Sequence, residues 1–198
     1  KVSTIAEGIN VQIEGATKGT GVLIEKDGNQ YTVITAWHVI EENRPNEEVG
    51  IITTDGNEHI WESKSLKRIG EVDMGIFTFT STNSYQIAKI GDAKTISMGN
   101  TIFISGYPLA SSSVPTRLIR FLKGQVITNT DLSIPEGYQL HYNNDTRVGM
   151  SGGSILNIKG ELIGIHGRTE NNDEVAKLTG KVSSTGINTV SYTHLRAH

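Results

Sequence analysis

Cysteine is absent from this sequence of 198 residues. Its absence excludes disulfide bonds, zinc sites built on thiolates and cysteine nucleophiles. It is compatible both with the cytosol and with a bacterial exported protein that does not rely on disulfides. Proline is also scarce, with four residues, which disfavours a disordered linker. No apolar run approaches the roughly 20 residues of a membrane-spanning helix, so we expect no membrane partner.

Charge of one sign is not concentrated anywhere in the chain. The formal net charge is −3, and the Lys and Arg residues are scattered. Without a basic cluster that could follow a phosphate backbone, we do not expect nucleic acid as a partner. No group of His, Asp and Glu has the spacing of metal ligands, so neither a metal nor another cofactor is expected. We interpret His59 and His141 as surface or strand residues.

Short strand-like segments make up most of the chain. They alternate or run apolar over a few residues and are rich in Val, Ile, Thr, Tyr and Phe. The segments are Ile9–Gly15, Gly19–Gly28, Gln30–Ile40, Asp73–Thr80, Thr101–Pro108, Arg117–Thr128, Tyr138–Tyr142, Gly153–Gly160 and Glu161–Gly167. No long helical pattern is found, and the best helical candidate is a short turn after Ala36. The sequence therefore predicts an all-β barrel or sandwich.

Ser151 lies in the glycine-rich stretch GMSGG, just before an apolar run. A serine hydroxyl becomes a nucleophile only when a neighbouring base removes its proton. The oxyanion that then develops needs backbone N–H donors, and flanking glycines let the backbone bend so that such donors converge. Taken alone, the same stretch is equally typical of a glycine-rich hairpin.

Two further residues complete a possible catalytic set. His38 follows an apolar strand and could act as the base, and Asp73 leads into another strand and could orient the imidazole. Alone, each has an ordinary explanation, because a histidine at a strand end is usually structural and an aspartate there is usually a turn or cap residue. Together with Ser151 they follow the order His, Asp, Ser on a chain that independently indicates an all-β fold.

Three sequence blocks carry a family resemblance: TAWHV, VDMGIF, and GMSGGSIL followed by GELIGIHG. They resemble the catalytic blocks of trypsin-like serine peptidases. The chain is more similar to bacterial members without disulfides, and to a cyanobacterial group among them, than to digestive enzymes. The resemblance covers roughly Ile5 to Val190 with its spacing intact. It implies two antiparallel six-stranded β-barrels, a chymotrypsin-like double barrel, with the active site in the cleft between them.

The resemblance also implies a role for each residue of the blocks. His38 would be the general base and then the general acid, Asp73 would orient it, and Ser151 would form the acyl-enzyme. The N–H groups of Gly149 and Ser151 would form the oxyanion hole. The departures from the family's pattern are small and remove no catalytic group. They are Ser154 where many relatives have proline, Ile155 where valine or leucine is usual, and Gly75 where alanine is common.

We expect a single domain over residues 1–190, with an N-terminal barrel over about 5–85 and a C-terminal barrel over about 95–190. Residues 191–198 do not continue the strand pattern and are interpreted as a non-native or disordered tail. One rival fold uses the same serine, because Gly149-x-Ser151-x-Gly153 also fits the nucleophile elbow of α/β-hydrolases. That fold needs alternating strands and helices and a histidine after the serine, and the missing helices disfavour it.

The residues just before Ser151 and on the following strand should line the substrate pocket. Thr146, together with His166 and Gly167 in GIHG, resembles the pocket of glutamyl endopeptidases, where the hydroxyl and the imidazole bind a glutamate carboxylate. Asp145, in contrast, has the spacing of the aspartate with which trypsin selects Lys and Arg. We predict a preference for Glu, with Asp145 as the alternative and with a purely structural His166 left open.

The leading hypothesis is a serine endopeptidase whose partner is a polypeptide substrate. The alternative is a catalytically silent trypsin-like domain that binds peptides or proteins. We expect a monomer that is secreted or periplasmic, since a chain without a signal-like segment can be one from which the signal has been removed. Lys1-Val2-Ser3 does not resemble the apolar start of digestive relatives, so we expect no trypsin-style activation.

Overall fold

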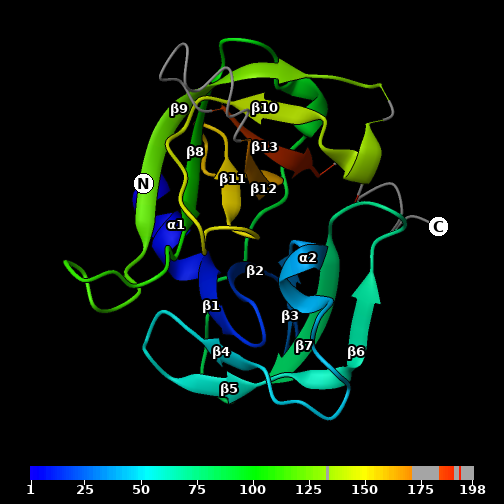
Figure 1. Ribbon diagram of the computed structural model, residues 1–198, viewed down its shortest axis with the longest axis vertical. Helices are drawn as coiled ribbons and strands as arrows, with labels where there is room; N and C mark the ends of the chain where they lie inside the picture. Colours follow the sequence, from blue (N-terminus) through cyan, green and yellow to red (C-terminus); the bar gives the residue numbers. More distant parts are fainter. Residues whose placement is uncertain (133, 171–182, 190–191, 193–198) are drawn as a thin grey trace.

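The computed structural model describes residues 1–132, 134–170, 183–189 and 192. Two antiparallel β-units follow each other along the chain, and Figure 1 shows the first below and the second above. Short helical turns carry the chain between strands at the junction. The predicted all-β class is confirmed, because strands dominate the described residues.

The first unit is a strongly curved seven-stranded sheet in the order β5-β4-β1-β2-β3-β7-β6. Its strands are β1 (Asn10–Glu14), β2 (Lys18–Asp27), β3 (Gln30–Thr35), β4 (Gly50–Ile52), β5 (Glu58–Ile60), β6 (Glu62–Arg68) and β7 (Gly75–Thr80). The sheet surrounds one apolar core that includes Val11, Tyr31 and Phe77. It differs from the expected six-stranded barrel in that β5 and β6 are edge strands that are not hydrogen-bonded to each other.

The second unit is a closed six-stranded barrel in the order β10-β13-β12-β11-β8-β9, as expected. Its strands are β8 (Thr101–Gly106), β9 (Arg120–Asn129), β10 (Leu140–Tyr142), β11 (Ser154–Leu156), β12 (Leu162–Glu170) and β13 (Ser183–Asn188). A second core that includes Ile104, Tyr142 and Ile155 fills it.

A third apolar cluster joins the two units. It includes Val22 and Met74 from the first unit and Leu156 and Ile165 from the second. Burial of this shared cluster fixes the two units against each other. Side chains at the junction therefore have defined positions although they come from distant parts of the sequence.

Two α-helices border the junction (Figure 1). α2 (Trp37–Ile40) is the short turn expected after Ala36. α1 (Val2–Ile9) was not expected, and it packs Ala6 and Ile9 into the shared cluster. Two 3₁₀ turns complete the fold, η1 (Ala93–Thr95) and η2 (Pro135–Gly137). None of the helices in the described part of the chain has the length and apolarity needed to cross a membrane.

The predicted tail falls almost entirely outside the described residues. Tyr192 is its one described member, and that side chain is buried in the shared cluster.

Candidate active site

His38 and Asp73 meet at the junction of the two units. His38 lies on α2, directly after β3, and Asp73 precedes β7, which pairs with β3. The imidazole Nδ1 is 2.6 Å from Asp73 Oδ2, and the backbone N–H of His38 donates to Asp73 Oδ1 at 2.8 Å. Because the carboxylate accepts at Nδ1, a neutral imidazole carries its proton there and leaves Nε2 as the base.

The Asp73 carboxylate is held in its ionised form. Burial acts to raise the pKa of this side chain, which is 3% exposed. The hydrogen bonds and electrostatic attraction of His38, together with the hydroxyl of Tyr138, outweigh that effect and hold the pKa of Asp73 below its ordinary value. The pair thus combines a fixed negative charge with an imidazole, as general-base catalysis requires.

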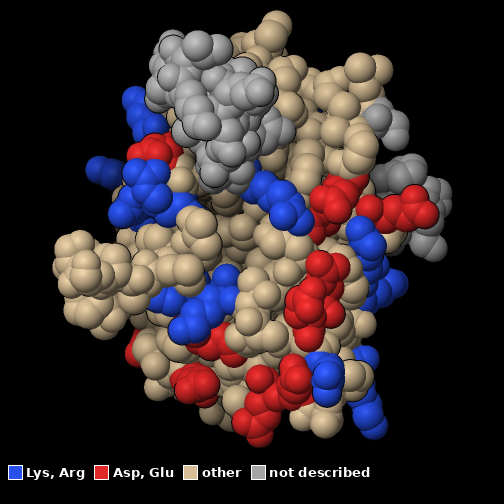
Figure 2. Space-filling model, viewed as in Figure 1, with Lys and Arg blue, Asp and Glu red and all other residues tan. Residues whose placement is uncertain are grey.

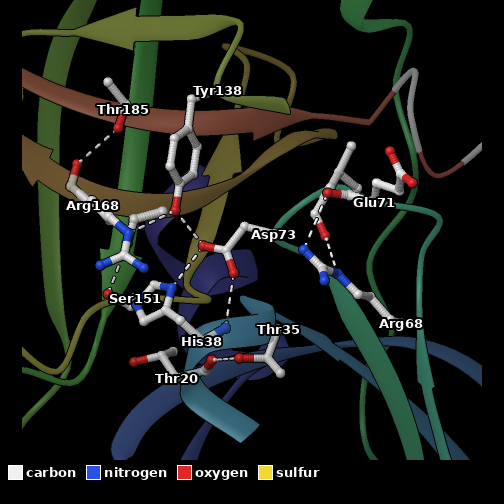
Figure 3. Close-up of polar contacts among 12 residues, drawn as sticks. Thr20, Thr35, His38, Arg68, Glu71, Asp73, Tyr138, Ser151, Arg168 and Thr185 are labelled. Atoms are coloured by element: carbon white, nitrogen blue, oxygen red, sulfur yellow. Dashed lines mark hydrogen bonds and ion pairs between the residues drawn. The ribbon is translucent and has the colours of Figure 1, made fainter. Parts of the chain in front are cut away.

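Tyr138 is a member of the site that the sequence did not indicate. It follows η2, and its hydroxyl donates a short hydrogen bond to Asp73 Oδ2. Arg168 Nε donates to the same hydroxyl oxygen at 2.9 Å (Figure 3). Burial and the Asp73 carboxylate raise the pKa of Tyr138, so the phenol keeps its proton. Gly167 makes room for the ring, because a Cβ at this position would lie 2.5 Å from a ring carbon of Tyr138.

Ser151 lies on the loop before β11, which packs against the start of α2. Its carbonyl oxygen accepts from the N–H of Thr20 at 2.9 Å, and a Cβ on Gly152 would lie 3.1 Å from the backbone nitrogen of Ala36. Figure 3 shows its side chain in one group with those of His38 and Asp73. The hydroxyl of Ser151 donates to the carbonyl oxygen of Gly167 at 2.8 Å. No hydrogen bond joins Ser151 and His38, both of which are described.

The backbone around Ser151 presents two free N–H groups. Gly149 has a φ of +98°, which favours glycine. The carbonyl of Val148 accepts from Leu109 at 2.9 Å, and the carbonyl of Met150 accepts from Gly153 at 3.0 Å. In a trans peptide the N–H points away from the carbonyl. The N–H groups of Gly149 and Ser151 therefore face the other way, and neither has an acceptor within the described residues.

His166 and Thr146 are both buried near this loop. His166 lies on β12, and its Nδ1 is 2.5 Å from the hydroxyl of Tyr142, whose pKa is raised by burial. Burial, with a contribution from His38, lowers the pKa of His166 to about 3, so the ring is neutral. The hydroxyl of Tyr142 and Nδ1 of His166 share this hydrogen bond, in which either group can be the donor. The hydroxyl of Thr146 is 2.7 Å from that of Ser184 on β13.

Asp145 lies outside this buried group. Its side chain is 71% exposed and forms an ion pair with the neighbouring Arg147, which is itself 52% exposed. The structure therefore separates two residues that are adjacent in sequence, Asp145 at the surface and Thr146 inside.

In the described part of the chain, no three or more His, Asp or Glu side chains form a group that could hold a metal ion.

Comparisons with known proteins identify the family of the chain. The trypsin-like peptidase domain matches residues 19–165. The chain is 25% identical over 169 residues to the serine protease Do-like HtrA of Lactobacillus helveticus, which covers 79% of this chain and 37% of that protein. It is 27% identical over 157 residues to a probable periplasmic serine endoprotease, DegP-like, of Pseudomonas putida, which covers 78% of this chain and 30% of that protein.

The chain thus spans about a third of the length of these curated relatives. A crystal structure of the Rv3671c protease in an inactive form superposes with a TM-score of 0.73 at 17% identity, covering 99% of this chain and 91% of that one. This likeness concerns the fold alone and agrees with the double-barrel arrangement. Since the domain match extends from β2 through the Ser151 loop into β12, the chain belongs to the trypsin-like peptidase family.

Proposed function

We propose that this chain is a serine endopeptidase that cleaves peptide bonds through an acyl-enzyme on Ser151. The observation that carries the proposal is the 2.6 Å contact between His38 and Asp73, made beside Ser151 in a chain of this family. The N–H groups of Gly149 and Ser151, which have no acceptor within the described residues, support it, since an oxyanion needs backbone donors that are free to bind it.

The reaction begins with a rotation of the Ser151 side chain. Its Oγ leaves the carbonyl of Gly167 and turns toward His38, a change of one staggered rotamer. His38 Nε2 takes the hydroxyl proton as Oγ attacks the substrate carbonyl, and Asp73 stabilises the imidazolium. The N–H groups of Gly149 and Ser151 bind the oxyanion. His38 then protonates the leaving amine, and a water molecule releases the acyl group by the same steps.

A second candidate function is a silent domain that binds peptides without cleaving them. The observation that favours it is the hydrogen bond from Ser151 to Gly167, which points the hydroxyl at a carbonyl rather than at His38. We rank it second because the His38–Asp73 pair and the free N–H groups are already in place, and catalytic hydrogen bonds often align only when substrate binds.

Labelling with a fluorophosphonate distinguishes the two functions. We expect the parent chain and a Ser113→Ala control, altered on an exposed loop, to be labelled. We expect Ser151→Ala to remain unlabelled. Peptide hydrolysis should fall by about 10⁶ in Ser151→Ala, as in other triad deletions. A folded parent chain that binds peptides yet takes no label would favour the silent domain.

We further propose that the pocket prefers Glu, and Asp less, before the scissile bond. The burial of Thr146 and His166 near the Ser151 loop supports this, since a hydroxyl and an imidazole are side chains of the kind that can bind a carboxylate. The exposure of Asp145 and its pairing with Arg147 argue against selection of Lys and Arg.

Peptides that differ only at the residue before the scissile bond test the pocket. We expect the Glu peptide to exceed its Gln counterpart in kcat/KM by about tenfold, or about 1.4 kcal/mol. Thr146→Val should reduce that ratio, whereas Asp145→Asn should leave it unchanged. Cleavage chiefly after Lys or Arg, lost in Asp145→Asn, would contradict the acidic preference.

We propose a polypeptide substrate and a secreted or periplasmic location. The location is supported by the relative described as a probable periplasmic endoprotease. Figure 2 shows acidic and basic side chains interspersed on the face displayed, without a continuous basic stripe, which fits a protein that does not bind nucleic acid. Fractionation of producing cells with an antibody tests the location, and light scattering tests the monomeric state that we also propose.

A further inference from the structure

A buried arginine lies in the loop between β8 and β9, which is drawn in green in Figure 1. The side chain of Arg117 is 5% exposed, although its neighbours Thr116 and Leu118 are both exposed. A buried charge is costly unless it is paired and its donors are satisfied. Glu14 on β1 supplies the counter-charge, with its carboxylate 2.8 Å from Arg117 Nη1.

The other acceptors of Arg117 are backbone carbonyl groups from four segments of the chain. Nη1 donates to Ile13 at 3.2 Å, and Nε donates to Pro108 at 3.4 Å. Nη2 donates to Tyr107 at 2.7 Å, to Gly19 at 2.8 Å and to Gly149 at 3.2 Å. The planar guanidinium can satisfy several acceptors at once because its donors have a fixed geometry.

These contacts hold, from two sides, the loop between β10 and β11 that carries Gly149 and Ser151, which we call the oxyanion loop. On one side, Arg117 holds the carbonyls of Tyr107 and Pro108, which immediately precede Leu109. The N–H of Leu109 in turn donates to the carbonyl of Val148. Because the peptide between Val148 and Gly149 is trans, the N–H of Gly149 then points away from Leu109. On the other side, Arg117 donates to the carbonyl of Gly149 itself.

Thr20 strengthens the same bracing from the first unit. Its hydroxyl donates to the carbonyl of Gly149 at 2.8 Å and accepts from the N–H of Tyr107 at 2.9 Å. Arg117 thus contacts three parts of the molecule where they pack together: the loop between β8 and β9, the oxyanion loop and the first sheet.

We propose that Arg117 is a positioning residue for the oxyanion hole and that Glu14 holds it in place. The role rests on the proposed function, because it concerns the donors that the acyl-enzyme reaction uses. Arg117 touches no reacting atom, and it acts by fixing the orientation of the peptide that joins Val148 to Gly149.

Two matched inhibitors test this role. A peptide aldehyde forms a hemiacetal with Ser151 and places its oxygen in the hole, whereas the corresponding peptide alcohol occupies the same subsites without an oxyanion. Deleting one donor of such a hole costs about 10²–10³ in rate. For Arg117→Lys we expect kcat and aldehyde affinity each to fall by about 10- to 100-fold. The KM and the alcohol affinity should stay within about threefold, since the binding subsites are unchanged.

Glu14→Gln provides a second variant if Arg117→Lys fails to fold. Its amide keeps an acceptor near Arg117 and removes only the charge, so we expect the same selective loss of aldehyde affinity at a smaller size. Arg120→Lys is the matched control, since Arg120 is exposed at the start of β9, and it should behave as the parent.

The outcomes separate this role from the proposed function. An active parent chain whose Arg117→Lys and Glu14→Gln variants bind aldehyde and alcohol in the parental ratio would overturn the role of Arg117 alone. A parent chain that takes no fluorophosphonate label would overturn the proposed function and this role with it.

Discussion

The hydroxyl of Tyr138 donates to Oδ2 of Asp73, the same oxygen that contacts His38 Nδ1. A side chain of the second unit thereby holds the acid of the first unit. The carbonyl of Glu136, in the turn just before Tyr138, also accepts from the N–H of Asp73 at 2.8 Å. Glu136 has a φ of +62°, which is uncommon for a residue other than glycine. The turn is thus shaped to contact Asp73 at two points.

Replacing Tyr138 by Phe tests the first of these contacts. The ring keeps its place against Gly167, but the buried carboxylate loses a donor at a cost of about 1–3 kcal/mol. We expect kcat to fall about tenfold, equivalent to about 1.4 kcal/mol, with KM nearly unchanged. Tyr85→Phe is the control, because Tyr85 donates to Asp55 at 2.8 Å far from the site. Equal losses of kcat in both variants would contradict a specific role for Tyr138.

The same variant should also shift acid unfolding. In the folded protein the pKa of Asp73 lies below its ordinary value, partly because of Tyr138. Stability from such a group is present above the unfolded pKa and is lost as the pH falls through the folded pKa. Since Tyr138→Phe raises the folded pKa, we expect it to unfold at a higher pH than the parent chain during acid titration followed by circular dichroism.

Different physical causes determine which of these features could be predicted from the sequence. His38, Asp73 and Ser151 could be named as candidates because their order along the chain and the sequence blocks around them resemble those of a known family. Tyr138 carries no such motif, and its contact with Asp73 exists only because the two units pack together. Similarly, Asp145 and Thr146 are adjacent, and only the folded chain shows that one is exposed and the other buried.

The secondary structure shows the same contrast. α1 was overlooked although Val2, Ile5, Ala6 and Ile9 have the spacing of one helical face. β6 gave no signal, because its sequence ESKSLKR lacks apolar alternation. It is a strand because it pairs with β7, a neighbour that the local sequence does not reveal.

His166 should make stability depend on pH in a second range. Its pKa falls from about 6.5 to about 3 on folding, because the folded environment excludes the charged ring. Between these values the unfolded chain binds a proton that the folded chain does not bind. Stability should therefore decrease as the pH falls from 6.5 toward 3, by at most about 1.4 kcal/mol per pH unit from this group.

His166→Asn isolates that contribution, because its amide oxygen can still accept from Tyr142. Urea unfolding of the variant between pH 4 and 6.5 should show a shallower dependence of the unfolding free energy on pH than in the parent chain. Parallel curves for the two proteins would mean that His166 is protonated in the folded state.

Gly152 tests how closely the two units approach at the nucleophile. Its φ is +89°, and an added Cβ would lie 2.0 Å from the carbonyl oxygen of Thr20 and 2.2 Å from the hydroxyl of Thr35. We expect Gly152→Ala to lose at least about 2 kcal/mol of stability through backbone strain alone, and to lose fluorophosphonate labelling. Gly28→Ala is the control, since its φ is also positive but its Cβ would meet open space. Retained labelling in Gly152→Ala would contradict the close approach.

Ser154, which stands where many relatives have proline, forms a reciprocal pair with Asn10. The amide of Asn10 donates to the Ser154 hydroxyl at 2.9 Å, and the N–H of Ser154 donates back to Asn10 Oδ1 at 3.2 Å. Both residues are fully buried, and they join β1 to β11. Proline has neither a hydroxyl nor a backbone N–H, so it could form neither of these hydrogen bonds. We therefore expect the residue at position 154 to depend on Asn10.

A double-mutant cycle tests this dependence. Ser154→Pro should destabilise the chain by about 1–3 kcal/mol, because Asn10 Oδ1 loses its donor, while the amide nitrogen keeps only its hydrogen bond to the carbonyl of Ala6. In Asn10→Ala the pair is already broken, so Ser154→Pro should there cost at least about 1 kcal/mol less. Thermal unfolding of the four proteins measures the coupling. Two residues that depend on each other lose their shared hydrogen bonds only once, so their losses of stability do not add. Additive losses of stability would therefore show that Ser154 does not depend on Asn10.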